Sequence, residues 1–318
     1  MADPSSPPQQ APAGKPRRVP IPVMEVFDHE RFVRDYKTPG KPVVIKSGAA
    51  AWPAVAKWTP EYFAERFGDK PVTPSVNLPD TEVPYQYTDV DFRERMTVAE
   101  FVKRMDGGEH CYIDQVLAGF FEGVAEDYRF EDFRPKDIKD IVFWLGSSTR
   151  SGLHYDHVEN FFAQVCGTKL AILAAPEEVR NLHVFPDSHT KSQVAPEHPD
   201  LAAHPRLALA TLQQATLEPG DVLYVPRGWW HYFASSPKSI SLACWHDEPL
   251  TPAYDVKIVI GSRDWALLTR TVRDFFWHGV LGRPYKRRLY SPPPTGVMLH
   301  DLVSRSMPWR QGKSSTAA

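Results

Sequence analysis

The sequence predicts a mainly β protein, a double-stranded β-helix in which antiparallel strands form a double-sheet jelly roll with helices at its N- and C-terminal ends. Two observations support this fold class. The expected strands are short and numerous, and Gly and Pro turns separate them. Helical spacing of apolar residues is confined mostly to the two ends of the chain. Strands of this kind bury a shared core when two sheets pack face to face.

Composition bounds the class of protein further. Of the 318 residues, 42% are hydrophobic, which is enough for a sizeable core, and the formal net charge is -2. This balance gives no global electrostatic reason to bind nucleic acid or an anionic membrane. The three cysteines lack CxxC spacing, which suits a reducing compartment. No apolar run reaches the ~18 residues of a membrane span, and no signal pattern opens the chain, so we expect a cytoplasmic protein without membrane contact.

The domain organisation follows from local composition. Residues 1–20 are expected to be a disordered tail, because this Pro-rich stretch cannot bury enough apolar surface to offset chain entropy. Residues 21–306 are predicted to be a single domain, with the jelly-roll core at about 110–250 and a helical region at 251–306. Residues 307–318 are expected to be a flexible tail.

Several elements are expected before the core. Helical spacing runs through residues 25–36, and a strand follows at 41–45. Thr59 followed by Pro60 is typical of a helix N-terminus, and Thr97 has the pattern of a second one. The large aromatic residues around the first of these helices are expected to be core residues rather than ligand contacts. They are Trp52, Trp58, Phe63 and Phe67.

Residues 115–140 form an irregular stretch rich in acidic and aromatic residues. One interpretation is a loop at the mouth of a cleft, since loops carry specificity on a rigid scaffold. The other is ordinary packing of Phe120, Phe121 and Tyr128. The sequence leaves both open.

The strongest functional pattern begins at His154-Tyr155-Asp156. An imidazole and a carboxylate two residues apart on a strand point to the same face, so both can hold one metal ion. Asn160, Phe162 and Gln164 continue this face.

A returning strand and a third ligand complete the pattern. Residues 166–168 read as a hairpin turn, after which Lys169 opens an apolar strand. Far downstream, a turn at 218–221 and a buried strand at 222–225 lead to His231. Two histidines and one carboxylate, with other positions open, are the arrangement of non-haem Fe(II) oxygenases.

The remaining histidines are not expected to form a second metal site. His183, His189, His198 and His204 lie in a connector whose spacing matches no metal pattern, so we interpret them as surface residues. His157 has the wrong strand parity for the inner face and is interpreted in the same way.

The C-terminal region contains a helix that Asp264 is expected to cap. Apolar residues recur along it at helical spacing and must be buried, either on the same chain or against a copy of it. This stripe consists of Trp265, Leu268, Val272, Phe275, Phe276 and Val280. We therefore expect a homodimer formed through this helix.

These motifs together resemble those of the JmjC and cupin-like 2-oxoglutarate oxygenases over roughly residues 25–297, and they look most like the asparaginyl hydroxylase that inhibits hypoxia-inducible factor. The resemblance implies that His154, Asp156 and His231 are the iron ligands. It places the co-substrate contacts at Lys169, Tyr112, Ser151, Asn160 and Phe162. Two departures matter. Ser151 replaces a threonine but keeps a hydroxyl, and Ala243 replaces an asparagine, which removes one polar contact.

The resemblance also implies an activity. Fe(II), 2-oxoglutarate as co-substrate and dioxygen would support hydroxylation of a protein or peptide side chain, with release of succinate and carbon dioxide. Hydroxylation of a modified tRNA base and demethylation of N-methyl-lysine are the alternatives, although the near-neutral charge argues against RNA. A different metal-binding cupin, or a cupin that has lost its site, would leave Lys169 and Tyr112 unexplained.

Overall fold

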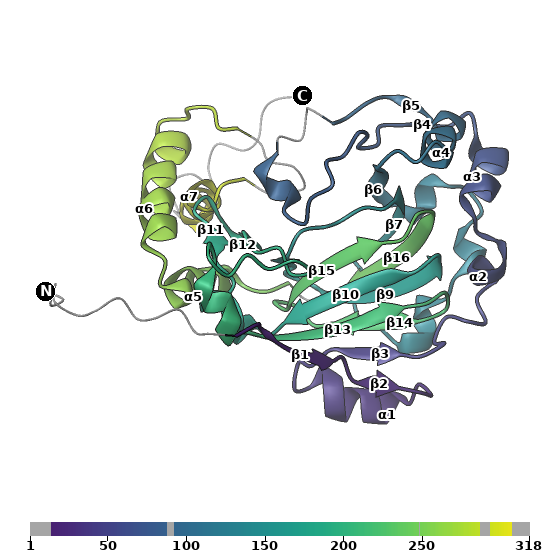
Figure 1. Cartoon of the computed structure of the whole chain (residues 1–318), viewed down its shortest axis with the longest axis horizontal. Helices are drawn as coiled ribbons and strands as arrows, with labels where there is room; N and C mark the ends of the chain where they lie inside the picture. Colours follow the sequence, from purple (N-terminus) through teal and green to yellow (C-terminus); the bar gives the residue numbers. More distant parts are fainter. Residues whose placement is uncertain (1–13, 88–91, 248, 287–292, 307–318) are drawn as a thin grey trace, which may run out of the picture.

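The computed structural model describes residues 14–87, 92–247, 249–286 and 293–306. Two seven-stranded sheets pack as a jelly roll, which confirms the predicted fold class (Figure 1). Sheet A has the order β1-β13-β10-β15-β8-β12-β11 and sheet B the order β2-β3-β14-β9-β16-β7-β6. The strands of sheet A are β1 (Arg17–Pro20), β8 (His154–Tyr155), β10 (Lys169–Ala174), β11 (Val184–Phe185), β12 (Ser188–Ser192), β13 (Thr211–Leu217) and β15 (Trp230–Ser235). Those of sheet B are β2 (Val23–Met24), β3 (Val43–Ile45), β6 (Cys111–Leu117), β7 (Asp140–Ser147), β9 (Glu159–Cys166), β14 (Val222–Val225) and β16 (Ser239–His246).

Most successive core strands change sheet, and this corrects the hairpin predicted at residues 166–168. Strand β9 pairs with β14 and β16 in sheet B, whereas β10 pairs with β13 and β15 in sheet A. Gly167 turns the chain between the sheets with φ +68°, and a Cβ there would lie 2.6 Å from the carbonyl oxygen of Lys238. The turn is therefore a corner of the jelly roll that requires glycine.

The space between the sheets holds an apolar core whose members alternate along the strands as period two demands. From β10, Ala171 and Leu173 point inward, while Ile172 belongs to the cluster on the outer face of sheet A. From β9, Phe162 points inward, while Phe161 packs outside sheet B. This alternation directs the predicted site residues into the barrel.

Helices cover the outer face of sheet B. They are α1 (His29–Phe32) with its continuation η1 (Val33–Lys37), α2 (Pro53–Lys57), α3 (Pro60–Phe67) and α4 (Val98–Asp106), beside the short pair β4 (Pro71–Val72) and β5 (Met96–Thr97). The predicted caps are confirmed: Thr59 Oγ1 accepts from the backbone N–H of Tyr62, and Thr97 forms a capping box with Glu100. The four aromatic residues expected in the core are buried there.

Ordinary packing is the correct interpretation of the aromatic residues in the irregular stretch. Phe121 and Tyr128 are buried in the cluster outside sheet B, and Phe120 is packed against it. The short helices of this stretch are η4 (Ala118–Phe120), η5 (Ala125–Asp127) and η6 (Phe130–Phe133). Lys57 Nζ and Trp58 Nε1 both donate to the carboxylate of Asp127, which secures the segment against the N-terminal helices.

The boundary of the expected N-terminal tail is wrong by several residues. Arg17–Pro20 form β1, which runs parallel to β13 in register with residues 211–214. The order comes from backbone pairing with a sheet edge and from the buried side chain of Ile21, neither of which composition reveals. Residues 1–13 and 307–318, also predicted to be flexible, lie outside the described residues.

The C-terminal region contributes α5 (Pro252–Ser262), α6 (Trp265–Asp274), the π-helix η9 (Phe275–Val280) and α7 (Thr295–Ser306), at the edge of the molecule beyond β11 and β12 (Figure 1). Asp264 caps α6 as predicted, accepting from the N–H groups of Ala266 and Leu267. Most of the predicted stripe is not buried within the chain: Trp265 is 79% and Phe276 58% exposed. Leu267, Thr271 and Asp274 form the buried face instead.

Two further regions complete the fold. The connector between β10 and β13 contains η7 (Pro176–Arg180) and η8 (Pro205–Leu209), and η2 (Pro84–Gln86) precedes β5. In the part of the chain that the structure describes, no helix combines the length and apolar character needed to cross a membrane.

Candidate active site

A cavity of about 500 Å³ opens between the two sheets, and all eight predicted site residues line it. They arrive from five strands and the loops next to them. The residues are Tyr112, Ser151, His154, Asp156, Asn160, Phe162, Lys169 and His231. The spacing pattern in the sequence therefore corresponds to one place in the fold, while the role of each residue remains a prediction.

The three candidate metal ligands converge at the wall formed by β8 and β15. His154 and His231 are directly paired across these strands, and their ring centroids lie 4.3 Å apart. The Asp156 carboxylate lies 3.9 Å from His154 Nε2 and 3.6 Å from His231 Nε2. Ligands about 2.1 Å from one metal ion are themselves about 3 to 4 Å apart, so these atoms fit a single ion.

Backbone contacts prepare both imidazoles for this role. The Nδ1 atom of His154 lies 3.0 Å from the Gly152 carbonyl, and that of His231 lies 3.0 Å from the Trp229 carbonyl. A carbonyl only accepts, so each Nδ1 carries the proton and each Nε2 presents a lone pair to Asp156. Burial, together with nearby positive charge, lowers the pKa of His154 well below its ordinary value, which keeps the ring neutral. Neutral imidazole is the form that binds metal.

Lys169 lies inside the barrel, as the resemblance implies. Its side chain is buried, with only 3% of the residue exposed, and its Nζ lies 5.0 Å from the centroid of the Phe162 ring. Phe162 in turn stacks on Phe233 at 4.4 Å. Burial lowers the pKa of Lys169 to about 7, and among the described residues no carboxylate pairs with it. A buried, unpaired ammonium is costly unless a bound anion compensates it.

The other predicted co-substrate contacts line the same cavity, but they differ in how far their side chains are already engaged with the protein. The Tyr112 ring stacks on Trp144 at 5.5 Å. Asn160 is buried, and its Oδ1 has no hydrogen-bond partner. Ser151 Oγ donates to the Gly152 carbonyl and accepts from the Phe233 N–H, so its hydroxyl is already engaged with the backbone. Ala243 also lines the cavity, where it offers no polar atom.

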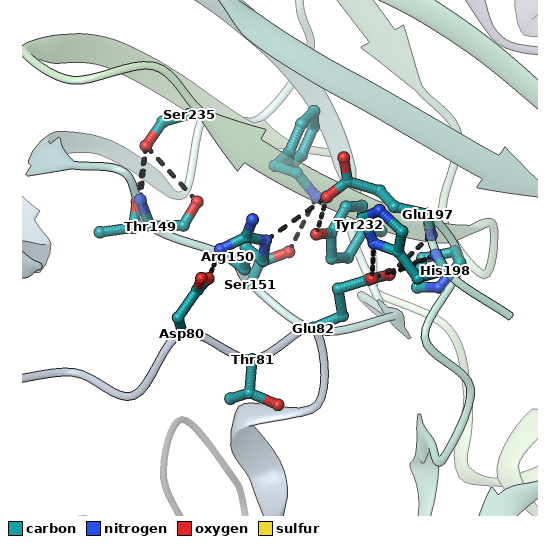
Figure 2. A network of polar contacts seen from close by, with 12 residues as sticks. Asp80, Thr81, Glu82, Thr149, Arg150, Ser151, Glu197, His198, Tyr232 and Ser235 are labelled. Carbon is teal, nitrogen blue, oxygen red and sulfur yellow. Dashed lines mark hydrogen bonds and ion pairs between the residues drawn. The ribbon is translucent and has the colours of Figure 1, made fainter. Parts of the chain in front are cut away.

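A polar network holds the segment that carries Ser151 (Figure 2). Arg150 forms ion pairs with Asp80 and with Glu197, and Glu197 accepts from the Tyr232 hydroxyl. Glu82 accepts from the backbone N–H groups of residues 197 and 198. The network joins four segments far apart in sequence, and it steadies the loop before β8.

The donor atoms around the cavity fit the implied metal ion and dicarboxylate. The buried side-chain atoms without a partner include Trp144 Nε1 and Trp245 Nε1 as well as Asn160 Oδ1, and all three residues line this cavity. Unpartnered polar groups in a buried space indicate a missing ligand or water. Lys169 provides a cation and the two indole N–H groups provide donors for an anion beside the two imidazoles and the carboxylate, while Asn160 Oδ1 provides an acceptor.

Sequence reasoning missed several residues of the cavity. Arg93 forms a two-pronged ion pair with Asp114 at 2.7 and 2.8 Å, and Met298 approaches from α7. Lys191, on β12, is the residue paired with His154. Of these residues, only Asp114 could have been found from the sequence, because it lies two residues after Tyr112 in the same expected strand and so shares its face. The others reach the site through pairings between distant segments.

Two histidines interpreted as surface residues are not. His189 is buried, and its Nε2 lies 2.9 Å from Asp255 Oδ1. His157 lines the cavity, and its Nε2 lies 2.7 Å from the same oxygen. Strand β12 and helix α5 bury these groups, which no local spacing predicts.

A third group of His and acidic residues lies outside sheet B. Glu159, His246 and Asp247 have side-chain atoms within 4.8 Å of one another. Lys37 Nζ lies 2.8 Å from Asp247 and 3.8 Å from Glu159, and the Tyr224 hydroxyl donates to Glu159. These partners already supply the compensating charge and hydrogen bonds, so the group is explained as an ion-pair cluster.

A jelly roll that presents two histidines and an aspartate on its inner wall has the architecture of the cupin class, with side chains that could hold a metal ion. Residues 29–251 match the family described as the cupin-like domain, and the chain belongs to that family.

The curated proteins similar to this chain include lysine-specific demethylases and tRNA wybutosine-synthesizing proteins. The chain is 32% identical over 238 residues to lysine-specific demethylase 8 of Xenopus tropicalis, covering 71% of this chain and 52% of that protein. It is 33% identical over 237 residues to the Danio rerio protein of the same name, covering 68% and 55%. It is 28% identical over 280 residues to tRNA wybutosine-synthesizing protein 5 of Danio rerio, covering 80% and 84%. The chain thus spans about half the length of these demethylase relatives. The narrower resemblance to the asparaginyl hydroxylase stays a prediction.

Proposed function

We propose that this protein is an Fe(II)- and 2-oxoglutarate-dependent dioxygenase that hydroxylates a side chain of a protein or peptide, with conversion of 2-oxoglutarate to succinate and carbon dioxide. One observation carries the proposal. The Nε2 atoms of His154 and His231 face Asp156 in the same cavity that holds the buried, unpaired Lys169. The first group suits a divalent metal ion, and the second suits a bound dicarboxylate.

Each residue then has a role that follows from its surroundings. His154, Asp156 and His231 would hold Fe(II) through three positions and leave the others open. Lys169 would pair with the distal carboxylate of 2-oxoglutarate, assisted by the hydroxyl of Tyr112. Asn160 would accept a hydrogen bond, through its unpartnered Oδ1, from a ligand beside the metal. Ser151 would contribute through its remaining lone pair or after rotation of its hydroxyl.

The protein's part in the reaction is positioning and exclusion of water. When bound, Fe(II) and 2-oxoglutarate supply the activation of dioxygen that oxidises a substrate C–H bond. The stacked pair Phe162 and Phe233 forms an apolar wall next to Lys169, which would limit the access of water to this part of the cavity. Formal charges also balance, because two positive charges on iron and one on Lys169 match one negative charge on Asp156 and two on 2-oxoglutarate.

Two alternative substrates have specific support. The wybutosine-synthesizing relative aligns over 84% of its own length, which favours a modified tRNA base. The name of the demethylase relatives favours N-methyl-lysine. Against RNA stands the formal net charge of -2, which gives no broad attraction for phosphates. The three reactions leave different products, so they are distinguishable by experiment.

The test incubates the pure protein with Fe(II), 2-oxoglutarate and a cell extract, separated into protein and RNA fractions. Mass spectrometry would detect the gain of one oxygen atom on a peptide or nucleoside, and an aldehyde-trapping assay would detect formaldehyde from demethylation. We expect oxygenated peptides that require 2-oxoglutarate and are absent with Asp156→Ala. Oxygenated nucleosides alone, or formaldehyde alone, would replace the proposed substrate class by the corresponding alternative. No 2-oxoglutarate turnover in any fraction, with the folded protein, would reject the oxygenase assignment.

A further inference from the structure

A second lysine of the cavity, Lys191, has no role in the binding of metal or co-substrate described above. It lies on β12 as the antiparallel partner of His154 on β8. Residues directly opposite each other on paired strands project to the same face, so Lys191 and His154 share the inner wall of the cavity. The lysine therefore stands next to the predicted metal ligands, on a different strand from Lys169.

The ammonium of Lys191 is not neutralised by the protein. The side chain is partly buried, and among the described residues none forms an ion pair or a hydrogen bond with it. Burial lowers the pKa of Lys191 to about 8, and the negative charge of Asp156 opposes this effect without reaching ion-pair distance. The charged form is thus held in a poorly solvated place.

When metal and co-substrate are bound, the other charges of the site compensate one another and not the positive charge of Lys191. Fe(II), Asp156, 2-oxoglutarate and Lys169 balance one another, and Arg93 balances Asp114. His157 faces the carboxylate of Asp255. With 2-oxoglutarate bound, Lys191 is therefore a positive charge that no carboxylate of the described residues reaches at ion-pair distance, and it lines the cavity through which a substrate must approach the metal.

We propose that Lys191 is a specificity-determining residue that receives an anionic side chain, Asp or Glu, of the peptide substrate and rejects cationic side chains. This inference rests on the proposed function and names the substrate class. A carboxylate would form a charge-assisted hydrogen bond with the ammonium and neutralise the site. A trimethyl-lysine group would place a second positive charge beside Lys191, which disfavours binding. The charge of Lys191 therefore disfavours demethylation of N-methyl-lysine, the reaction that the name of the demethylase relatives indicates.

The test measures binding near the metal directly, without turnover. The full-length protein is loaded with Mn(II) and 2-oxoglutarate without oxygen, and NMR records the proton relaxation that Mn(II) causes in small probes. The probes are the capped amino acids N-acetyl-aspartate methylamide, N-acetyl-asparagine methylamide and N-acetyl-trimethyllysine methylamide, together with guanosine monophosphate. Each is compared in the unaltered protein and in the variants Lys191→Met, Lys191→Glu and Lys136→Met. Lys136 is an exposed lysine outside the cavity and provides the matched control.

We expect the aspartate probe to bind at least about tenfold more tightly than the trimethyllysine probe in the unaltered protein and in Lys136→Met. Lys191→Met should abolish the difference, and Lys191→Glu should reverse it. Equal binding of the two probes, an order unaffected by Lys191→Met, or no binding of any capped amino acid would overturn the proposal. Stronger, Lys191-dependent binding of guanosine monophosphate would overturn it in favour of a nucleotide.

The relaxation of 2-oxoglutarate itself separates this inference from the proposed function. If 2-oxoglutarate binds next to Mn(II) in every variant, while substitution of Lys191 does not change the order of probe affinities, only the substrate class is wrong. If 2-oxoglutarate does not bind near Mn(II) in the unaltered protein, the proposed function fails, and the inference fails with it.

Discussion

Asp255 Oδ1 on α5 lies 2.7 Å from Nε2 of His157, the residue that directly follows the candidate metal ligand Asp156. The same oxygen accepts a hydrogen bond from the hydroxyl of Tyr155, the residue that directly precedes Asp156. His189 approaches this oxygen at 2.9 Å. Although burial opposes the charge, these histidines lower the pKa of Asp255 well below its ordinary value, so it remains a carboxylate. One helix of the C-terminal region therefore fixes the segment that carries a metal ligand.

This relationship predicts that Asp255→Asn weakens metal binding at a distance. Loss of the charge would release His157 and Tyr155 and let Asp156 move, and such outer partners typically contribute about 10- to 100-fold to metal affinity. The measurement is Fe(II) or Mn(II) titration at constant pH. Asp274→Asn serves as the control, because Asp274 is also buried but pairs with Arg270 and Arg273 on α6. If both variants lose stability equally and neither changes metal affinity, Asp255 is merely structural.

Asp156→Ala tests the metal centre itself. The variant keeps two imidazoles but loses the proposed carboxylate ligand. Its metal affinity should therefore fall by more than the loss of about 10- to 100-fold that is expected when an outer partner is removed. The side chain is partly exposed and, among the described residues, forms no hydrogen bond with the core, so the midpoint of thermal unfolding without metal should hardly change. Retention of full metal affinity and of succinate production would exclude Asp156 as a ligand.

The parts of the site that could be predicted are those governed by alternation within one strand. His154 and Asp156, or Asn160 and Phe162, share a face because side chains alternate, whatever the rest of the chain does. Lys191 and His189 lie on a short strand without an apolar alternation, and their position depends on pairing between β12 and β8. The strand at Arg17–Pro20 likewise forms only because the edge of β13 is available. Each of these features was missed because it depends on strand pairing between distant segments rather than on local propensity.

The exposed apolar face of α6 and η9 predicts self-association through a second copy of the chain. Replacing Trp265 and Phe276 by Ser should convert a homodimer into monomers with little loss of monomer stability, since both side chains are mostly exposed. Light scattering at micromolar concentration measures the mass. Leu267→Ala provides the contrast, because this side chain is fully buried and its loss should cost about 2 to 5 kcal/mol of unfolding free energy. A monomeric unaltered protein would rule out the dimer.

Lys169 predicts a specific pH dependence of 2-oxoglutarate binding. Without co-substrate, burial lowers the pKa of Lys169 to about 7, whereas pairing with a carboxylate would raise it. Below pH 7 the ammonium is already charged, so binding takes up no proton; above it, binding must protonate the lysine. Affinity should therefore fall by up to about tenfold for each pH unit above 7, until the pKa of the complex is reached. Calorimetry of the Mn(II)-loaded protein in buffers of different ionisation enthalpy would detect the proton uptake. Lys169→Arg should bind without this pH dependence, because a guanidinium stays charged, and Lys169→Met should bind roughly a hundredfold more weakly at pH 7. A pH-independent affinity in the unaltered protein, or normal affinity in Lys169→Met, would show that Lys169 does not face the co-substrate.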